Sequence, residues 1–364
     1  MKTGIITFHF VNNFGGALQA YALKSACEEC GVEAHLIDYR QWFIRFTDMV
    51  RMFPVVKNPK VIFAGLRTMH ARVRRKKRFA AFRERYLSMS RTYYSAKALF
   101  NDPPAYDKYI CGSDQIWNTF ITCGIESPYY LAFEKDPQKK FSYAPSFGSS
   151  TVPVRYLKRI REYLNELGDI SVREKEAIGT VKKLTGRDAL QLIDPTLLIP
   201  VSQWEALAES AKIRIPYKEF ILVYIMQKDD TVYEYAGRLK EKYNIPVVEI
   251  GRYGYKASFV DRCIVDLGPL EFVWLFRNAT HVCTNSYHGI LFSILFSKKI
   301  CIIPCKRFKS RIDSLTELFQ IEQGSDVNDL ALDVHYDRER IRETLAVEKE
   351  KSMNYLRKNL GVSK

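Results

Sequence analysis

Strand-like and helix-like patterns alternate along the chain, and this alternation restricts the fold more than any other feature. At the start, a β-rich run, a loop, a helical pattern and a second strand follow one another over residues 5–10, 11–16, 17–30 and 32–39. A helix that links two successive strands places them side by side and parallel. The opening therefore predicts a β-α-β unit.

The alternation continues in two consecutive sets. The first set predicts strands at 106–111, 141–144, 169–172 and 190–193, with helices at 154–167 and 174–184. The second set predicts strands at 220–226, 247–250, near Ile264, 281–284 and 300–303, with helices at 232–243, 270–278 and 287–297. We expect the α/β class, with two Rossmann-like doubly wound domains that face a central cleft.

The 364 residues are enough for two domains. We expect an N-terminal α/β domain over 1–200 with a basic helical insertion over about 41–91, a connection over 201–218, a C-terminal α/β domain over 219–335 and a charged helix over 336–364. Ligands of such sheets lie outside the carboxyl ends of the strands. Candidate site residues are therefore sought in the loops that follow strands.

Positive charge is concentrated in one segment. The 56 Lys and Arg exceed the 41 Asp and Glu by 15, and residues 67–91 hold ten Lys or Arg and one acid, Glu84, a local excess of nine. Such an excess indicates an anionic partner. The segment is either a solvated helix face or a docking surface for an anionic membrane or a lipid-diphosphate carrier. Aromatic residues do not interleave with these cations, so we expect no nucleic-acid partner.

The first ten residues do not resemble a signal peptide, because their apolar run is short and contains His9. No apolar run approaches the ~20 residues of a membrane span. We therefore expect a cytoplasmic protein, associated with the inner membrane face if residues 67–91 dock there, with its eight cysteines reduced. The pairs Cys27 with Cys30 and Cys301 with Cys305 lack the further ligands of a zinc site, so we expect structural thiols and no metal.

The segment 284–289 is the first candidate site. Asn285 or Ser286 can cap the helix that follows the strand, and Tyr287 and His288 then lie in its first turn. A helix N-terminus favours a phosphate or carboxylate, and a histidine there can donate a proton. The alternative is a buried histidine that hydrogen-bonds a backbone carbonyl.

Three further candidates follow strands of the first set. Arg173 presents a planar fork to a carboxylate or phosphate, or it forms a surface salt bridge with Glu174 or Glu176. The loop with Asn13, Gly15 and Gly16 lets backbone approach a ligand, although it lacks the G-x-G-x-x-G spacing of dinucleotide sites. Asp114, next to Gln115, is either a base or hydroxyl acceptor, or a helix cap.

Seven motifs in order resemble those of the polysaccharide pyruvyl transferase family. They are NFGGALQAYAL at 13–23, YD at 106–107 with CGSDQIWN at 111–118, YAPSFG at 143–148, SVRE at 171–174, DPTL at 194–197, NSYHG at 285–289 and SRI at 310–312. The resemblance implies a fold like that of the GT-B glycosyltransferases, with the first domain on the acceptor side and the second on the donor side.

The resemblance also implies a reaction. The pyruvyl group of phosphoenolpyruvate moves to hydroxyls of a sugar in a surface polysaccharide or its lipid-linked precursor, a pyruvate ketal forms, and phosphate leaves without a cofactor. His288 is then the candidate general acid, or else the group that neutralises the leaving phosphate. Asp114, or a residue near Asn13, is the candidate that orients or deprotonates the hydroxyl. Arg173, Asn285, Ser286, Tyr287 and Arg311 are expected to bind the donor, and Asn13, Gly15, Gly16 and Gln115 the acceptor.

Two other functions are consistent with the sequence. A nucleotide-sugar glycosyltransferase would need an acidic residue to bind the ribose in the second domain, and Glu249 and Asp266 are the candidates. A non-catalytic subunit of a polysaccharide assembly complex would instead use the basic segment 67–91 as a docking surface.

Overall fold

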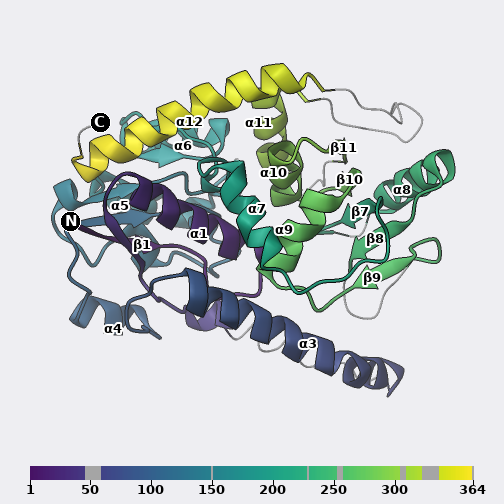
Figure 1. Ribbon diagram of the computed structural model, residues 1–364. Coiled ribbons are helices and arrows are strands. Elements are labelled where there is room, and N and C mark those ends of the chain that lie inside the picture. Colours follow the sequence, from purple (N-terminus) through teal and green to yellow (C-terminus); the bar gives the residue numbers. More distant parts are fainter. Residues whose placement is uncertain are drawn as a thin grey trace. The chain divides into compact units, whose positions relative to one another are not determined.

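The computed structural model describes residues 1–45, 59–148, 151–227, 229–251, 257–303, 309–321 and 336–362. The chain divides into two compact units. The first unit comprises Met1–Met49, Arg83–Ile199 and Leu345–Lys364, and the second comprises Val50–Phe82 and Pro200–Thr344. Figure 1 shows the helices and strands of both units.

The first unit contains a four-stranded sheet in the order β2-β1-β3-β4, with every neighbouring pair parallel. Its strands are β1 (Lys2–Ile6), β2 (Glu33–Leu36), β3 (Lys108–Cys111) and β4 (Lys140–Ser142). Helix α1 (Phe14–Glu29) connects β1 to β2, as the sequence predicts. The chain therefore runs from β1 to one side and later returns to pair β3 with the other side of β1. A switch point between β1 and β3 is where sheets of this type bind ligands.

Short strands β5 (Ser171–Val172) and β6 (Leu190–Gln191) form a parallel pair next to β4. Two hydrogen bonds between serines connect β4 to β5. The Ser171 hydroxyl donates to the Ser142 carbonyl at 2.7 Å, and the Ser142 hydroxyl donates to the Ser171 carbonyl at 2.8 Å. The other elements of this unit are α4 (Ala96–Asn101), α5 (Val154–Asn165), α6 (Lys175–Thr185) and the 3-10 turns Ser127–Tyr130, Pro137–Lys139 and Pro195–Leu197.

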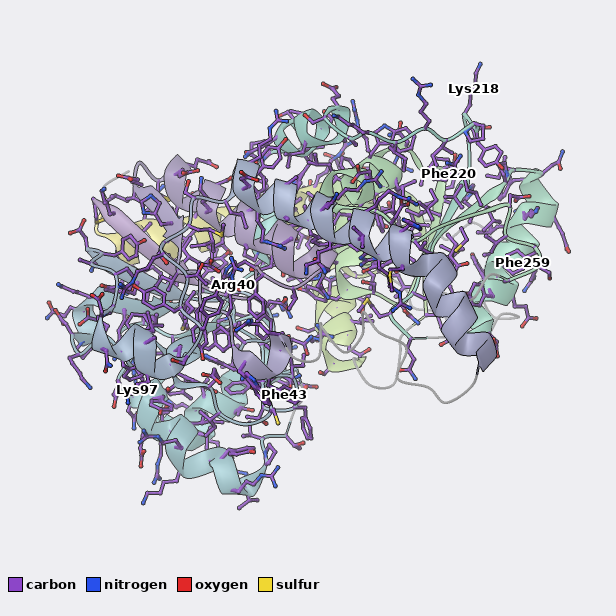
Figure 2. All side chains as sticks on the ribbon, turned by 90° about the horizontal axis from the view of Figure 1, so that it is seen from below. Arg40, Phe43, Lys97, Lys218, Phe220 and Phe259 are labelled. Atoms are coloured by element: carbon purple, nitrogen blue, oxygen red, sulfur yellow. The ribbon has the colours of Figure 1, made fainter. Side chains whose placement is uncertain are left out.

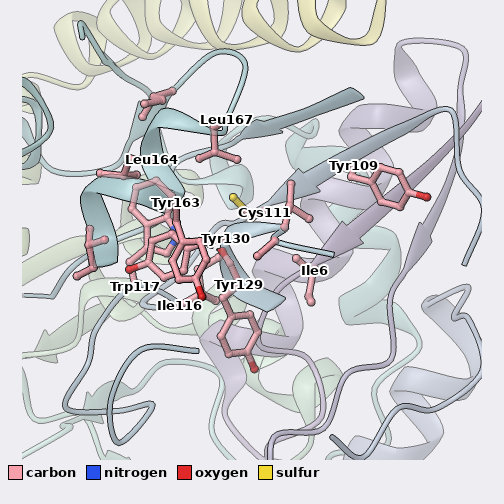
Figure 3. Packing of buried hydrophobic residues seen from close by; sticks show 14 of the residues in the cluster. Ile6, Tyr109, Cys111, Ile116, Trp117, Tyr129, Tyr130, Tyr163, Leu164 and Leu167 are labelled. Carbon is pink, nitrogen blue, oxygen red and sulfur yellow. Dashed lines mark hydrogen bonds between the residues drawn. The ribbon is translucent and has the colours of Figure 1, made fainter. Parts of the chain in front are cut away.

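Aromatic packing fixes the chain that follows β3. The rings of Trp117 and Tyr130 stack at 5.3 Å, and Tyr130 in turn stacks on Tyr163 of α5 at 5.3 Å (Figure 3). The indole of Trp117 also donates a hydrogen bond to the Tyr129 carbonyl at 3.0 Å. The loop that carries Asp114 therefore rests on a close-packed core. Figure 2 labels Arg40 and Phe43, which follow β2 in this unit.

The second unit has a five-stranded parallel sheet in the order β11-β10-β7-β8-β9. Its strands are β7 (Ile221–Tyr224), β8 (Val247–Ile250), β9 (Arg262–Ile264), β10 (His281–Thr284) and β11 (Lys299–Ile302). Its helices are α7 (Val201–Glu209), α8 (Asp230–Tyr243), α9 (Pro269–Asn278), α10 (Tyr287–Leu295) and α11 (Lys309–Phe319). The switch point of this sheet lies between β7 and β10.

Alternate residues of β7 show that helices cover both faces of this sheet. Ile221 and Val223 belong to a core that includes Val232 and Leu239 of α8. On the opposite face, the ring of Tyr224 packs against Phe272 of α9 at 5.1 Å. Both units are therefore Rossmann-like, which confirms the predicted α/β class.

Two long helices include residues of both units. Helix α3 (Pro59–Tyr86) falls within the predicted insertion, of which residues 46–58 lie outside the described part, and its residues to Phe82 group with the second unit. Helix α12 (Arg338–Leu360) contributes residues 345 onward to the first unit. There Leu356 and Leu360 are buried, and the Tyr355 hydroxyl donates to the Ser142 carbonyl at 2.9 Å. Among the described residues, no helix is both long and apolar enough to cross a membrane.

Candidate active site

The acceptor residues proposed for the first unit lie at its switch point. Asn13 caps α1, with its side-chain oxygen accepting from the Gly16 amide at 3.0 Å. A Cβ atom added to Gly16 would lie 3.2 Å from the Phe8 carbonyl oxygen and 3.7 Å from the Asp114 carboxylate. Gly15 and Gly16 are both buried in the first turn of the helix. Glycine thus allows the end of β1, the start of α1 and Asp114 to pack closely.

Asp114 follows β3 in a left-handed backbone conformation, with φ of 66°. Such a conformation is unfavourable for a non-glycine residue and persists where surrounding contacts fix it. Here the Ser146 amide donates to the Asp114 carbonyl at 2.9 Å, and the Gln115 amide donates to its carboxylate at 2.8 Å. Turns follow Asp114 instead of a helix, so its carboxylate does not act as a helix cap.

Gln115 is part of the wall of this loop. Its side-chain oxygen accepts from the Asn118 amide group at 2.9 Å. Gly148, with φ of 68°, packs so closely on these two side chains that a Cβ atom there would overlap both of them. The turn can therefore pack against Gln115 and Asn118 only with glycine at position 148.

Arg173 connects the ends of three strands. It follows β5, and its side chain is 1% exposed. Its guanidinium lies 2.9 Å from Asp194, which follows β6, 3.4 Å from Glu174, and 3.7 Å from Asp114, which follows β3. The salt bridge is thus buried, not on the surface, and one cation is surrounded by three carboxylates. The donor-binding role of Arg173 stays a prediction, and Asp114 lies within ion-pair distance of its guanidinium.

In the second unit, too, polar side chains lie at the switch point of the sheet. The Asn285 side chain accepts from the Met226 amide at 2.7 Å and donates to the Gln227 carbonyl at 2.8 Å, so it ties the end of β10 to the end of β7. Ser286 caps α10, with its hydroxyl accepting from the Gly289 amide at 3.3 Å. The sequence left the choice of cap between these two residues open, and Ser286 has that role.

Three cationic or hydrogen-bonding groups gather at the start of α10. His288 lies in the first turn, and its ring is 5.4 Å from that of Tyr287. The guanidinium of Arg311, carried by α11, lies 5.7 Å from the centre of the Tyr287 ring, within the range of a cation–π contact. All three side chains are buried. This helix N-terminus therefore combines a positive dipole end with an arginine and a histidine, which suits an anionic ligand.

Sequence reasoning missed a second buried ion pair in the first unit. One ring nitrogen of His9 lies 2.9 Å from the Asp38 carboxylate, and the other lies 3.0 Å from the Thr7 carbonyl. Burial raises the pKa of Asp38, but hydrogen bonds from His9, Arg40 and Thr92 outweigh burial and hold this pKa well below its usual range. The position of His9 just after β1 was the only signal in the sequence that could have identified it.

The structure thus forms two groups of predicted site residues. Asn13, Gly15, Gly16, Asp114, Gln115 and Arg173 form one group in the first unit, and Asn285, Ser286, Tyr287, His288 and Arg311 form the other in the second. That the two groups serve one reaction stays a prediction. Asp194 and Glu174 join the first group through Arg173, and both belong to sequence motifs, although neither was predicted to contact it.

The candidate ribose-binding acids have contacts within the second unit. The Tyr233 hydroxyl donates to Glu249 at 2.6 Å, and Arg74 donates to Asp266 at 2.6 Å. Cys27 of α1 is buried and Cys30, at the end of this helix, is partly buried, and burial raises the pKa of both thiols. A thiol whose pKa is raised is a weaker nucleophile and metal ligand at neutral pH, which agrees with a structural role.

Two parallel sheets, each with its polar residues at a switch point, define a Rossmann-like protein of the GT-B type. The S. aureus MnaA–UDP co-structure is similar in fold, with a TM-score of 0.51 and 11% identity over 100% of this chain and 98% of that one. The glycosyltransferase SnogD from Streptomyces nogalater gives a TM-score of 0.45 and 12% identity, with 99% of each chain covered. No curated protein matches the sequence.

The sequence match is more specific than the fold. The model of the polysaccharide pyruvyl transferase family matches residues 13–307 of the 364. The chain belongs to this family, which confirms the resemblance drawn from the motifs between residues 13 and 307; the SRI motif at 310–312 lies beyond the match. Membership makes the protein a transferase of polysaccharide synthesis with a sugar acceptor.

Proposed function

We propose that this protein transfers the pyruvyl group of phosphoenolpyruvate to hydroxyls of a sugar, forms a pyruvate ketal and releases phosphate. The sugar belongs to a surface polysaccharide or to its lipid-linked precursor. The observation that carries the proposal is the grouping of His288 and Arg311 at the N-terminus of α10. Phosphoenolpyruvate carries a phosphate and a carboxylate, and both need cationic groups and N–H donors.

The proposed chemistry assigns a role to each group. His288 gives a proton to C3 of the enol, which leaves C2 electron-poor, and a sugar hydroxyl bonds to C2 while its proton passes to Asp114. Phosphate then leaves from C2 with the electrons of the C–O bond, and a second hydroxyl bonds to C2 and closes the ketal while its proton passes to His288. Arg311 and the amides of the first turn of α10 neutralise the phosphate as it departs, an electrostatic effect that contributes much of the rate in such reactions.

The experiment is to measure phosphate release from phosphoenolpyruvate and, by mass spectrometry, the gain of pyruvate by an acceptor glycan. The proposal is supported if the glycan gains the pyruvate mass with the wild type and does not gain it with active-site variants. Transfer from UDP-sugars with no use of phosphoenolpyruvate would instead identify a nucleotide-sugar glycosyltransferase. Wild-type function after loss of His288 would favour the non-catalytic subunit.

We also propose that α3 contacts an anionic membrane surface. From residue 69 onward its exposed side chains include Lys76, Lys77 and Arg85. Arg74 and Arg78 are instead directed to acids of the second unit, Asp266 and Glu271. The exposed cations are therefore available to lipid headgroups, where each Lys or Arg contributes about 1 kcal/mol. The expected location is the cytoplasmic side of the membrane that holds the lipid-linked acceptor.

A further inference from the structure

Three loops of the first unit carry exposed aromatic side chains. Among the residues described, Trp42 is 65% exposed, Phe120 68% and Tyr94 54%, while a fourth exposed aromatic residue, Phe100, lies on α4 with its ring 6.4 Å from that of Phe133. Aromatic rings that remain exposed in the folded protein are available to pack against a ligand.

Hydrogen bonds tie together the loops that carry these rings. The Gln41 side chain, next to Trp42, donates to the Thr122 carbonyl at 2.7 Å, two residues from Phe120. The Arg40 amide donates to the carbonyl of Tyr93, the neighbour of Tyr94, at 2.9 Å. Arg45 lies over the Tyr94 ring at 4.5 Å from its centre. The loops that carry the three exposed rings are thus tied to one another, and we call these three side chains the aromatic rim (Trp42, Tyr94 and Phe120).

A carboxylate adjoins the aromatic rim. Glu126 is partly exposed, and its two oxygens accept from the Tyr39 hydroxyl and, at 2.7 Å, from the Gln41 side chain. Burial raises the pKa of Glu126, although these two hydrogen bonds act in the opposite direction. Each carboxylate oxygen has a second lone pair, so an oriented Glu126 can accept a further hydrogen bond from a hydroxyl.

A chain of hydrogen bonds connects this surface to Asp114. The Thr122 amide donates to the Asn118 carbonyl at 3.1 Å, and the Asn118 side chain donates to Gln115 at 2.9 Å. Gln115 adjoins Asp114 and donates its amide to that carboxylate at 2.8 Å. The aromatic rim is therefore continuous with the loop that carries the candidate base.

We propose that the aromatic rim and Glu126 form a subsite for one pyranose ring of the acceptor glycan. A pyranose has an apolar C–H face, which packs on an aromatic ring, and hydroxyls at its edge, which donate to a carboxylate. Glu126 would repel an anion next to it, so a neutral sugar fits this part of the surface. The proposal rests on the proposed function, which supplies the sugar acceptor, and it adds where a sugar unit binds.

Fluorescence of Trp42 tests the subsite directly. Trp117 and Trp204 are buried, whereas Trp274 is partly exposed, so quenching by acrylamide is measured in a Trp274→Phe background, where it reports mainly on Trp42. The probes are methyl pyranosides of glucose, galactose and mannose, added at millimolar concentration without phosphoenolpyruvate. We expect at least one pyranoside to reduce quenching, Trp42→Phe to remove the signal, and Glu126→Gln to weaken the binding.

Kinetics with matched variants give the second test. Trp42→Ala with Phe120→Ala is expected to raise the KM for the glycan acceptor roughly tenfold or more, with the KM for phosphoenolpyruvate unchanged. Phe100→Ala, which removes an exposed aromatic ring that packs on Phe133, should change neither constant.

The outcomes separate this proposal from the proposed function. If a pyranoside protects Trp42 from quenching but the protein transfers no pyruvyl group, the subsite is supported and phosphoenolpyruvate is rejected as the donor. Absence of protection by every pyranoside, or protection by neutral lipid vesicles or by self-association instead, would overturn the subsite and leave the donor chemistry to its own assay.

Discussion

The guanidinium of Arg173 and the carboxylate of Asp194 lie 2.9 Å apart, and both side chains are almost completely buried. They follow the neighbouring parallel strands β5 and β6, so the contact joins two strand ends. Asp194 also accepts from the amide and hydroxyl of Thr196, at 3.0 and 2.8 Å. A charge pair in such surroundings orients its neighbours more than it stabilises the protein, because desolvation offsets much of the attraction.

Removal of Arg173 should be costly, because three carboxylates then remain together without their cation. We expect Arg173→Ala to lower the free energy of unfolding by ~3 kcal/mol or more, as urea denaturation would measure. Lys182→Ala, which breaks an exposed pair with Asp188, is the control and should leave the unfolding curve unchanged.

Arg173→Lys separates positioning from donor binding. If Arg173 orients Asp114, calorimetry should give an unchanged affinity for phosphoenolpyruvate while kcat falls. A large loss of affinity with an unchanged unfolding midpoint would show that the guanidinium binds the donor itself.

His288→Ala should keep the fold and lower kcat by ~100-fold or more, because the proposed proton donor is lost. Phosphate release with phosphoenolpyruvate and acceptor is the measurement, and circular dichroism checks the fold. Near wild-type release would reject the assignment. Ser293, farther along α10, offers a control as Ser293→Ala, since its hydroxyl donates only to the Gly289 carbonyl among its described contacts.

Gly148→Ala should destabilise the first unit by about 2 kcal/mol or more, because φ is 68° and the added carbon would overlap Asn118 and Gln115. Gly186 is the matched control, with φ of 72° and no atom near an added Cβ. Gly186→Ala should therefore cost only about 1 kcal/mol, the conformational part of the penalty. Equal shifts of the two unfolding midpoints would contradict the packing around Gly148.

The Asp38 carboxylate predicts a loss of stability in acid. Since the folded state lowers its pKa, the ion pair stabilises fully above the unfolded value of about 4 and loses its effect as the pH falls below that value. Unfolding midpoints of the wild type should decrease between about pH 4 and pH 2. Asp38→Asn should show a flatter profile over the same range, and an equally steep profile would assign the acid sensitivity to other groups.

Lys76→Glu with Lys77→Glu should reduce binding to phosphatidylglycerol vesicles by about tenfold or more at low salt. Lys158→Glu with Arg161→Glu, which changes exposed cations of α5, is the charge-matched control and should have a weaker effect. Equal sedimentation with neutral and anionic vesicles would exclude this surface as a membrane contact.

Much of the fold could be predicted because periodicity is a local property. The expected strands at 247–250 and 281–284 have the bounds of β8 and β10, and the helix after Thr284 begins where capping residues indicated. Helix α11 was missed, since its apolar residues cover few turns between charged ones. The strand at 5–10 begins and ends earlier than predicted, because Phe8 and His9 are apolar or aromatic residues in a buried loop.

The site was only partly predictable, because strand order decides which loops meet. The contacts of Arg173 with Asp114 and Asp194 join residues that are far apart in sequence. Sequence periodicity does not predict that the strands before them end side by side. The seven motifs identified most of these residues as candidates. Glu126 lies in no motif and no regular element, and only its hydrogen bonds to Tyr39 and Gln41 distinguish it.

The last turns of α12 have a consequence for how the protein is made. The first unit has its Ser142 edge covered by Tyr355, which the ribosome adds only after every residue of the second unit from Pro200 on. The core of the nascent first unit therefore lacks Leu356 and Leu360 until the second unit has been translated. We expect chaperones that shield unfinished surfaces during synthesis to act on the first unit.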